Sequence, residues 1–426
     1  MAENCMNYRF TFLRHGESTG NQQRVVQGQQ DFPLSKTGLD QTEKLAAYWK
    51  SKGKQFDKII SSPLSRAKLT AQIIQHHIHA PLTEDPLWLE RHAGELEGQP
   101  YQSAKKEPRF PRIKHLYEPT GKSGESDWEL YLRAGEAVQA LFLNPPGEYL
   151  IVSHGGILRQ ALTIISGAKP EIDNGGFHFM LHNTAYAILD FDLDRFRWHF
   201  HTLVQPQVPT QIENAPKDAL WFIFLRHGES EGNANNIFQG QMETPLTAHG
   251  EAQANAMSDY FLKYQSHYEI NSIFTSPQGR TVQTANPIAK KLNLKIQFSD
   301  LLKEVHYGKL QGLSWDEIAQ SSPNRPDLKN PYLHIGEDGE SWFELYLRGG
   351  KIIKMLTAHP KGNYLVVSHG SILNAMLWSL LGLVPQPGRN GTSFQFPNTG
   401  FAELVFSPSY RTWWFWNMAS LDLIES

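Results

Sequence analysis

The sequence has a single cysteine, no long apolar run and no dominant sign of charge. Among its 426 residues the lone cysteine is Cys5, which excludes a disulfide framework and a metal cluster built from cysteines. No stretch approaches the ~18 apolar residues of a membrane span, and no cationic leader precedes an apolar segment at the start. The 40 Lys and Arg against 43 Asp and Glu give a formal charge of −3. We therefore expect a cytoplasmic enzyme or binding protein, with neither nucleic acid nor a membrane as partner.

The chain repeats itself once. The run FLRHGES at residues 12–18 returns at residues 224–230, which is 212 residues later. Further matches follow in the same order with offsets of 214 and 215, among them Ser62-Pro63 with Ser276-Pro277 and Ser153-His154-Gly155 with Ser368-His369-Gly370. The period of about 200 residues is far too long for a solenoid. The sequence therefore predicts a tandem duplication of one complete domain.

A segment rich in proline and glutamine separates the two copies. Residues 205–211 read QPQVPTQ and lack apolar periodicity, which is typical of a short, fairly stiff linker. We expect an N-terminal domain over residues 1–202, a linker over 203–217 and a C-terminal domain over 218–426. Packing of the two domains on each other, as two subunits of a dimer would pack, is compatible with this arrangement.

Short apolar runs alternate with helical patterns in both copies. The expected strands are 7–13, 57–61, 149–153 and 220–225, and the expected helices include 64–79 and 157–165. Strands alternating with helices predict an α/β fold with a mostly parallel central sheet that is covered on both faces. Ligands bind such sheets outside the carboxyl ends of the strands.

This topology brings distant residues together at one edge of the sheet. Arg14, His15, Arg66 and His154 follow or lie just beyond expected strand ends, although up to 140 residues separate them. Two guanidinium groups match the oxygens of a phosphoryl group, and a histidine can serve as nucleophile, acid or electrostatic clamp. Glu90 could supply a proton to a leaving group. No metal or other cofactor is needed in this scheme.

Both halves resemble the histidine phosphatase superfamily, the phosphoglycerate-mutase-like group, because five scattered elements occur in family order and do so twice. The resemblance implies two three-layer αβα domains. It implies phosphorylated nucleophiles at His15 and His227 and general acids at Glu90 and Glu304. The phosphate pockets would be completed by Arg14, Arg66 and His154 in the first copy and by Arg226, Arg280 and His369 in the second. Amides and backbone groups expected to line the pockets are Asn21, Gln27, Gly28, Asn233, Gln239 and Gly240.

The assigned roles carry requirements on protonation. A histidine that attacks phosphorus must be neutral, and cationic neighbours lower its pKa toward that state. A carboxyl donor must be protonated when the leaving group departs, so we expect activity to be higher on the acidic side of neutrality.

Two reactions are open to such a pocket, namely hydrolysis of a phosphomonoester and transfer of phosphate between hydroxyls of a phosphoglycerate. Mutases of the resembled group carry a long insertion before the Gly-Glu-Ser element and a paired-arginine clamp. Here only 26 positions separate Gly98 from Gly124, and neither copy contains an Arg-Arg pair. The Gln27-Gly28 pattern also resembles the phosphatases. Metal-independent hydrolysis of a small phosphorylated metabolite is therefore favoured over a mutase reaction.

Two further hypotheses concern the difference between the copies. One half could be a phosphate-recognising regulatory module, although neither copy has lost its nucleophile or acid. Residues 99–124 carry six basic and two acidic side chains, whereas residues 313–339 carry two basic and five acidic ones. If these segments cover the pockets, the first site favours a more highly charged substrate.

Overall fold

The computed structural model describes residues 7–104, 115–170, 176–205, 216–321, 325–386 and 392–424. The chain divides into two compact units, residues 1–208 and 209–425. The predicted linker 203–217 lies mostly outside the described residues, because 206–215 are not among them. Its first two residues belong to a strand that ends at Val204, so the N-terminal domain extends slightly beyond residue 202.

The first unit is a mixed sheet flanked by helices. Its strands are β1 (Tyr8–Arg14), β2 (Lys58–Ser61), β3 (Leu82–Glu84), β4 (Glu148–Ser153), β5 (Gly176–Phe179), β6 (Tyr186–Asp192) and β7 (Arg197–Val204). Its helices are α1 (Thr19–Gln22), α2 (Lys36–Ser51), α3 (Ser65–Ile78), α4 (Tyr101–Ala104), α5 (Asp127–Leu141) and α6 (Gly155–Ser166). The strand order β3-β2-β4-β1-β6-β7 is parallel from β3 to β1, and β6 and β7 are antiparallel additions.

The second unit repeats this order as β10-β9-β11-β8-β13-β14. Its strands are β8 (Leu220–Arg226), β9 (Ser272–Thr275), β10 (Ile296–Phe298), β11 (Asn363–Ser368), β12 (Ser393–Phe394), β13 (Phe401–Ser407) and β14 (Thr412–Ala419). Its helices are α7 (Glu231–Ala234), α8 (Ala248–Lys263), α9 (Gln265–Tyr268), α10 (Gly279–Leu292), α11 (Trp315–Ser321), α12 (Pro326–Lys329), α13 (Trp342–Thr357), α14 (Gly370–Leu380) and α15 (Leu421–Ile424). The predicted α/β class, with a mostly parallel sheet in each copy, is confirmed.

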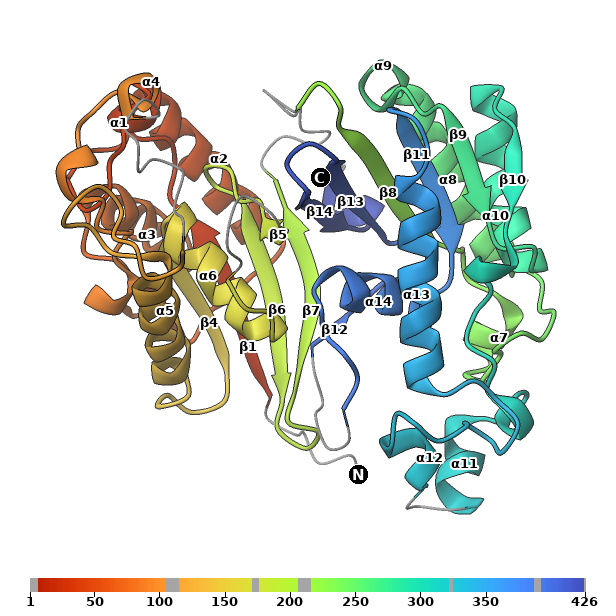
Figure 1. The fold of residues 1–426 in the computed structure, drawn as a ribbon. Coiled ribbons are helices and arrows are strands. Elements are labelled where there is room, and N and C mark those ends of the chain that lie inside the picture. Colours follow the sequence, from red (N-terminus) through yellow and green to blue (C-terminus); the bar gives the residue numbers. More distant parts are fainter. Residues whose placement is uncertain are drawn as a thin grey trace. The chain divides into compact units, whose positions relative to one another are not determined.

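The helices cover both faces of each sheet because parallel strands require right-handed crossovers. The crossovers through α2 and α3 move outward from β1 to β3, and the crossover through α5 returns to β4, so the two sets lie on opposite faces. Within each set the helices pack on each other, α2 on α3 and α5 on α6, and Figure 1 shows this layering in the first unit. The central strands are consequently almost continuous apolar runs, as in β4, where Tyr149 to Val152 are all buried.

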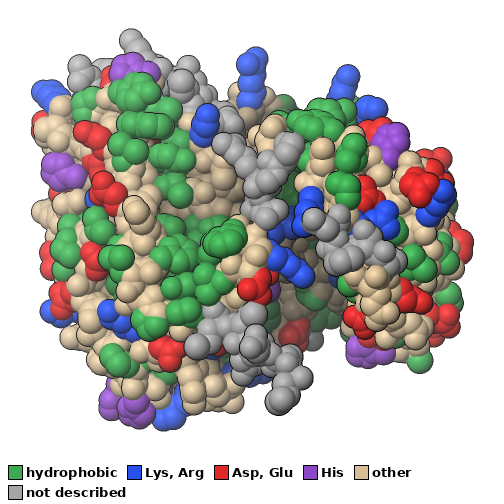
Figure 2. Space-filling view, turned by 90° about the horizontal axis from the view of Figure 1, so that it is seen from below, with side chains coloured by type: hydrophobic (Ala, Val, Ile, Leu, Met, Phe, Trp, Pro, Cys, Tyr) green, Lys and Arg blue, Asp and Glu red, His purple; other side chains and the backbone are tan. Residues whose placement is uncertain are grey.

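Charged side chains of both signs lie on the face of the molecule shown in Figure 2. The acidic and basic side chains are interspersed on this face. In the described part of the chain, no helix is both long and apolar enough to cross a membrane.

The second unit buries a carboxyl group away from the strand ends. Glu403 on β13 is 1% exposed and accepts hydrogen bonds from Tyr268 Oη (3.0 Å) and Asn417 Nδ2 (3.2 Å), while its Oε2 has no hydrogen-bond partner among the described residues. The Tyr268 hydroxyl also contacts that of Tyr260. Burial raises the pKa of Glu403 to about 7. The equivalent position in the first copy, on β6, is Ile188.

This carboxyl predicts a pH-dependent stability of the second unit. The folded state holds this proton more tightly than the unfolded chain does. The contribution of Glu403 to the free energy of unfolding is therefore fully present below about pH 4.5. It decreases by about 3 kcal/mol as the pH rises to about 7. We expect Glu403→Gln to remove most of this loss, since its amide stays neutral. Calorimetric unfolding of the full chain between pH 5 and 8 measures it, with Ile188→Val as the matched control in the first copy. An identical pH dependence in Glu403→Gln and the parent chain would refute the prediction.

Candidate functional site

The candidate site lies where three adjacent parallel strands end. Arg14, the last residue of β1, is in register with Ser153, the last residue of β4, so His15 and His154 emerge side by side. The centroids of these two imidazole rings are 5.0 Å apart. In the second copy, Arg226 is in register with Ser368, and the His227 and His369 rings are 5.1 Å apart. The predicted convergence at one sheet edge is thus present in both units.

The His15 ring is oriented by the backbone. Its Nδ1 lies 2.6 Å from the carbonyl oxygen of Gly16, and His227 repeats the contact with Gly228 at 2.7 Å. A carbonyl only accepts, so Nδ1 carries the proton and donates it. In the neutral ring, Nε2 therefore keeps its lone pair. Both rings are nearly buried, with 2% and 3% exposure, so each site holds an imidazole nitrogen with a free lone pair in a fixed orientation.

Burial and arginines keep these rings neutral. The pKa of His15 is well below its ordinary value because the ring is buried, with Arg66 and Arg14 as further causes. Burial likewise lowers the pKa of His227, followed by its two arginines. The direction agrees with the expectation from cationic neighbours, although burial is the larger cause. The hydrogen bonds to the Gly16 and Gly228 carbonyls raise the pKa of the two rings, but this effect is smaller than the lowering by burial and the arginines.

We predict that the His15 and His227 rings do not titrate between pH 5.5 and 8. An ordinary histidine loses its proton near pH 6.5, whereas burial and the neighbouring arginines hold the pKa of these two rings well below that value. Ring carbon-bound proton shifts, followed by NMR and assigned by comparison with His15→Ala and His227→Ala, measure this. A blocked histidine in the same buffer is the control, and a midpoint between pH 6 and 7 for either ring would contradict the depressed pKa.

Arg66 links three parts of the site. It is 1% exposed at the start of α3, and it donates from Nε to His154 Nδ1 (3.2 Å), from one terminal nitrogen to the Gln30 carbonyl (3.0 Å) and from the other to the Gly28 carbonyl (2.8 Å). His154 then donates from Nε2 to Ser62 Oγ at 2.7 Å. Burial lowers the pKa of Arg66 to about 10, so the guanidinium stays charged at neutral pH.

Arg14 presents a donor that has no protein partner. One terminal nitrogen donates to the Leu181 carbonyl at 2.7 Å, but the buried Nε has no hydrogen-bond partner among the described residues. Arg226 repeats both features, with its terminal nitrogen 2.6 Å from the Phe396 carbonyl. An unpaired buried N–H is costly. The same unpaired donor in both copies, beside the nucleophilic nitrogen, suits an oxyanion ligand.

Glu90 lies over the same pocket. Its carboxylate accepts from the backbone N–H of Arg91 (2.8 Å) and of Gly156 (3.0 Å), the second residue after His154. It interacts electrostatically with both Arg14 and Arg66. A side chain at position 156 would collide with it, because a Cβ there lies 2.3 Å from Glu90 Oε1.

The second copy holds its carboxylate in a related way. Glu304 accepts from the N–H groups of Val305 (2.9 Å), Ser371 (3.2 Å) and Ile372 (3.2 Å). Ser371 stands where the first copy has Gly156. Arg280 donates to His369 Nδ1 at 3.2 Å, as Arg66 does to His154. The two sites thus share both histidines and the arginines, and they hold the carboxylate through equivalent backbone N–H groups, with Ile372 as an additional donor in the second copy.

The predicted pocket-lining residues form a supporting layer. Ser18 caps α1 and donates to Gln27 Oε1 at 2.7 Å, while Asn183 Nδ2 donates to Asn21 Oδ1 (3.1 Å) and to the His15 carbonyl (3.0 Å). The side-chain oxygens of Asn21 and Gln27 are therefore bonded within the protein. The second copy matches with Ser230, Gln239, Asn233 and Asn398.

Gly28 and Gly240 serve through their backbone. Gly28 has φ 53° and Gly240 φ 51°, in the left-handed region that favours glycine. A Cβ at Gly28 would lie 2.2 Å from Glu97 Oε1, and one at Gly240 2.2 Å from Gln311 Oε1. This tight turn presents the carbonyl that Arg66 or Arg280 binds.

Several residues without a predicted role form hydrogen bonds that position the site. Ser62 and Ser276 bond the second histidines. Arg133 on α5 donates to the carbonyls of Leu89 (2.7 Å) and Glu90 (3.2 Å) while its guanidinium is paired with Glu125, and Arg348 repeats this with Glu340. The signal that could have found them is the second occurrence at offset 215, since Arg133 and Arg348 follow the repeated Gly-Glu-Ser element.

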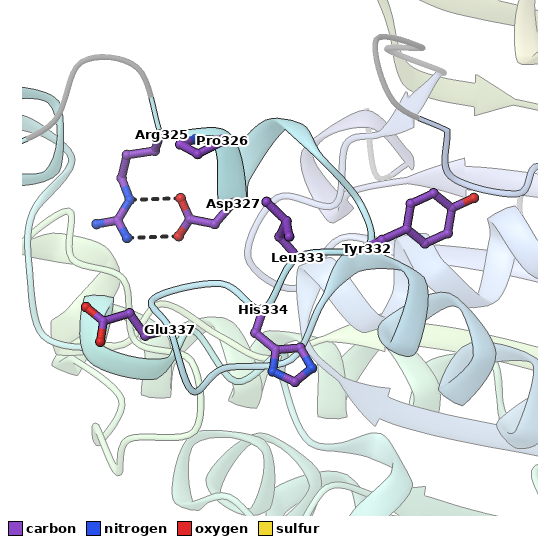
Figure 3. A pocket seen from close by; sticks show the side chains of 7 residues that line it. All are labelled: Arg325, Pro326, Asp327, Tyr332, Leu333, His334 and Glu337. Carbon is purple, nitrogen blue, oxygen red and sulfur yellow. Dashed lines mark hydrogen bonds and ion pairs between the residues drawn. The ribbon is translucent and has the colours of Figure 1, made fainter.

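The segments expected to cover the pockets are only partly described. The basic residues Lys105, Lys106, Arg109, Arg112 and Lys114 lie outside the described residues. In the second copy, Asp327 forms two hydrogen bonds with Arg325 beside a depression of about 710 Å³, where Figure 3 shows the two side chains face to face. Glu337 pairs with Lys309. Part of the acidic charge is therefore neutralised locally.

Comparison with known proteins agrees with the geometry. The family model described as "Histidine phosphatase superfamily (branch 1)" matches residues 10–203 and again 222–419. The chain belongs to this superfamily and contains two copies of its domain. In the part of the chain that is described, no group of three or more His, Cys, Asp or Glu could hold a metal ion.

Individual relatives each match about one domain. The chain is 32% identical over 188 residues to "Uncharacterized phosphatase PhoE" of Bacillus subtilis, which covers 43% of this chain and 89% of the relative. It is 34% identical over 176 residues to "Probable phosphoglycerate mutase GpmB" of Yersinia enterocolitica, covering 40% and 79%. Among solved structures, "Mycobacterial hydrolase 1" is 25% identical with a TM-score of 0.41, covering 47% of this chain and all of that one. Names of both kinds, phosphatase and mutase, occur among the relatives.

Proposed function

We propose that each domain hydrolyses small phosphomonoesters through a phosphohistidine intermediate, on His15 in the first domain and His227 in the second. The observation that carries the proposal is the fixed tautomer of both rings. A buried imidazole whose Nδ1–H is held by the next carbonyl offers Nε2 as nucleophile, beside arginine donors that match phosphoryl oxygens.

In the first half-reaction the His15 Nε2 lone pair attacks phosphorus while the bond from phosphorus to the ester oxygen breaks. Glu90, protonated, gives its proton to that oxygen, and the alcohol leaves. Nδ1 keeps its proton, which it donates to the Gly16 carbonyl, so the phosphorylated imidazole is a cation. The guanidinium groups of Arg14 and Arg66 would neutralise the equatorial oxygens.

In the second half-reaction a water molecule attacks the phosphorus of the phosphohistidine. The Glu90 carboxylate takes the water proton, the phosphorus–nitrogen bond breaks, and His15 returns to its neutral form with inorganic phosphate released. His154 begins neutral, since burial and Arg66 lower its pKa. Its Nδ1 accepts from Arg66 and its Nε2 donates to Ser62, so His154 would act by holding the Arg66 guanidinium in position.

A phosphoglycerate mutase reaction is the function that competes with hydrolysis, because some similar proteins bear that name. In a mutase the phosphohistidine would give its phosphate to a second hydroxyl in place of water. Release of inorganic phosphate and interconversion of 2- and 3-phosphoglycerate distinguish the two reactions.

The test is a phosphate-release assay on the full chain with a chelator present, using phosphoglycerates, sugar phosphates, nucleotides and phosphopeptides. We expect phosphate release from small esters and a stoichiometric acid-labile label on histidine after quenching with radioactive substrate. Interconversion of phosphoglycerates without release of phosphate would replace hydrolysis by transfer, and the absence of both would overturn the proposal.

A further inference from the structure

The two pockets differ in a set of residues around the shared machinery. At four equivalent positions the first copy has charged or small side chains and the second has aromatic or neutral ones. These pairs are Arg91 and Val305, Ala93 and Tyr307, Asp127 and Trp342, and Arg159 and Asn374, whereas Tyr101 and Trp315 are aromatic in both copies. This difference concerns the part of the substrate that leaves, since the phosphate-binding residues are the same.

Arg159 is placed to meet such a group. It lies on α6 one turn after Gly155 and Gly156, and residues three and four positions apart share a helix face. A Cβ on Gly155 would lie 3.4 Å from the Arg14 guanidinium, and one on Gly156 2.3 Å from Glu90. The same face of α6 therefore borders the pocket, and Arg159 interacts electrostatically with Glu90 and Arg14.

The charge of Arg159 is not paired within the described residues. Its Nε donates to the Phe179 carbonyl at 3.3 Å, and no carboxylate among those residues forms an ion pair with it. The nearby Arg91 differs, because its guanidinium is held by Asp127 and by Thr120 Oγ1 (3.1 Å). Desolvating an unpaired cation is costly, and an anionic group of a ligand would offset that cost.

The second copy has no cation at this place. Asn374 donates from Nδ2 to the carbonyls of Gly370 (3.1 Å) and Phe394 (2.6 Å) and accepts from the Phe394 N–H at 2.7 Å. Phe394 is the counterpart of Phe179. Asn374 therefore uses its amide to tie α14 to β12, whereas Arg159 contacts the corresponding carbonyl through its Nε alone.

Aromatic side chains form a wall in the second copy. The Phe238 ring is 4.8 Å from that of Tyr307 and 4.0 Å from that of Trp315, and the Tyr307 ring is 6.3 Å from that of Trp342. Tyr307 interacts electrostatically with Glu304, which places this wall beside the proposed acid. Trp315 is 55% exposed and so presents open ring surface. At the Phe238 and Tyr307 positions the first copy has Val26 and Ala93.

We infer that the two domains act on different phosphomonoesters. The N-terminal site takes an ester that carries a second anionic group, bound by Arg159. The C-terminal site takes an ester whose alcohol is an uncharged planar ring, stacked on the exposed Trp315 ring, which packs on the buried Phe238. This inference rests on the proposed hydrolysis.

Chains with one working nucleophile test the inference. His227→Ala leaves the N-terminal site and His15→Ala the C-terminal site. The reference probe is glycerol 3-phosphate. Compared with it, 3-phosphoglycerate carries an additional carboxylate and propane-1,3-diol bisphosphate carries a second phosphate. The aromatic probe is 1-naphthyl phosphate. Relative to glycerol 3-phosphate, we expect kcat/KM for at least one of the two anionic probes to be tenfold or more higher in His227→Ala than in His15→Ala, with the opposite order for 1-naphthyl phosphate. Which anionic probe gains shows whether Arg159 binds a carboxylate or a phosphate.

Smaller differences than tenfold would overturn the inference while leaving hydrolysis intact. Absence of phosphate release from every probe in both chains would instead overturn the proposed function on which it rests.

A second set of variants assigns the effect to Arg159. In the His227→Ala chain, Arg159→Asn should lower the ratio of the preferred anionic probe to glycerol 3-phosphate at least tenfold, mainly through KM, and Arg159→Lys should restore part of it. Lys44→Asn removes one charge from an exposed pair with Asp40 on α2 and is the matched control, with an unchanged ratio. If Arg159→Asn slows both probes equally, Arg159 is structural and the subsite is refuted.

Discussion

Removing both nucleophiles together is expected to lower phosphate release by at least ~1,000-fold, whereas removing either one leaves the activity of the other domain. A phosphohistidine route cannot proceed without a ring nitrogen, and what remains comes from binding and electrostatics alone. His15→Ala and His227→Ala are both buried substitutions, so each creates a cavity beside an arginine cluster.

The measurement compares the parent chain, the two single variants and the double variant for phosphate release and acid-labile label. His76→Ala, on an outer turn of α3, controls for loss of a histidine. Label that persists at half stoichiometry in each single variant and vanishes in the double variant is the expected pattern. Full activity in the double variant would exclude both rings as nucleophiles.

Replacing the carboxylate of each site should slow hydrolysis of alkyl phosphates by ~100- to ~10,000-fold, the usual contribution of a general acid. In the chain that carries His227→Ala, Glu90→Gln tests the first domain. In the chain that carries His15→Ala, Glu304→Gln tests the second. Gln keeps the size of the side chain and one acceptor oxygen, which can still bind the N–H group of Arg91 or Val305, and it removes the transferable proton.

The leaving group separates this role from a structural one. An alkoxide needs the proton, but 4-nitrophenolate leaves without it. We therefore expect the loss on 4-nitrophenyl phosphate to be at least tenfold smaller than on glycerol 3-phosphate in phosphoenzyme formation. Glu97→Gln, which changes a carboxylate bonded to the Gln29 and Ala93 N–H groups near the same turn, is the matched control. Equal losses on both substrates would show that Glu90 holds the loop and donates no proton.

The repeated motifs carried most of what the sequence could predict. An arginine-histidine pair after an apolar strand, occurring twice in register, gives both the strand and its functional end. For that reason β1, β2, β4 and β8 were predicted within one residue at their carboxyl ends. Parallel pairing then follows from the alternation of strands and helices, and it places Arg14 beside Ser153.

Other features depend on three-dimensional contacts that no local pattern encodes. Arg133 reads as an ordinary helix arginine until its partners, the Leu89 and Glu90 carbonyls, are seen. Arg159 on α6 and Asn374 on α14 occupy equivalent positions. Only their contacts with the equivalent carbonyls of Phe179 and Phe394 show that the charge of Arg159 is unpaired among the described residues, whereas the amide of Asn374 is fully hydrogen-bonded. The tautomer of His15 likewise depends on a contact with its own neighbour that composition does not reveal.

The bonds that Arg66 makes to the Gly28 and Gln30 carbonyls have a consequence for binding energy. Three of its five N–H donors are already engaged with the loop and with His154, so the cation is locked in place whether or not a ligand is present. A ligand oxyanion would meet a dipole array that needs almost no reorganisation, because folding has already met the entropic cost of aligning it. The tight turn at Gly28 therefore helps to hold the Arg66 guanidinium rigid through a backbone carbonyl, although glycine has no side chain.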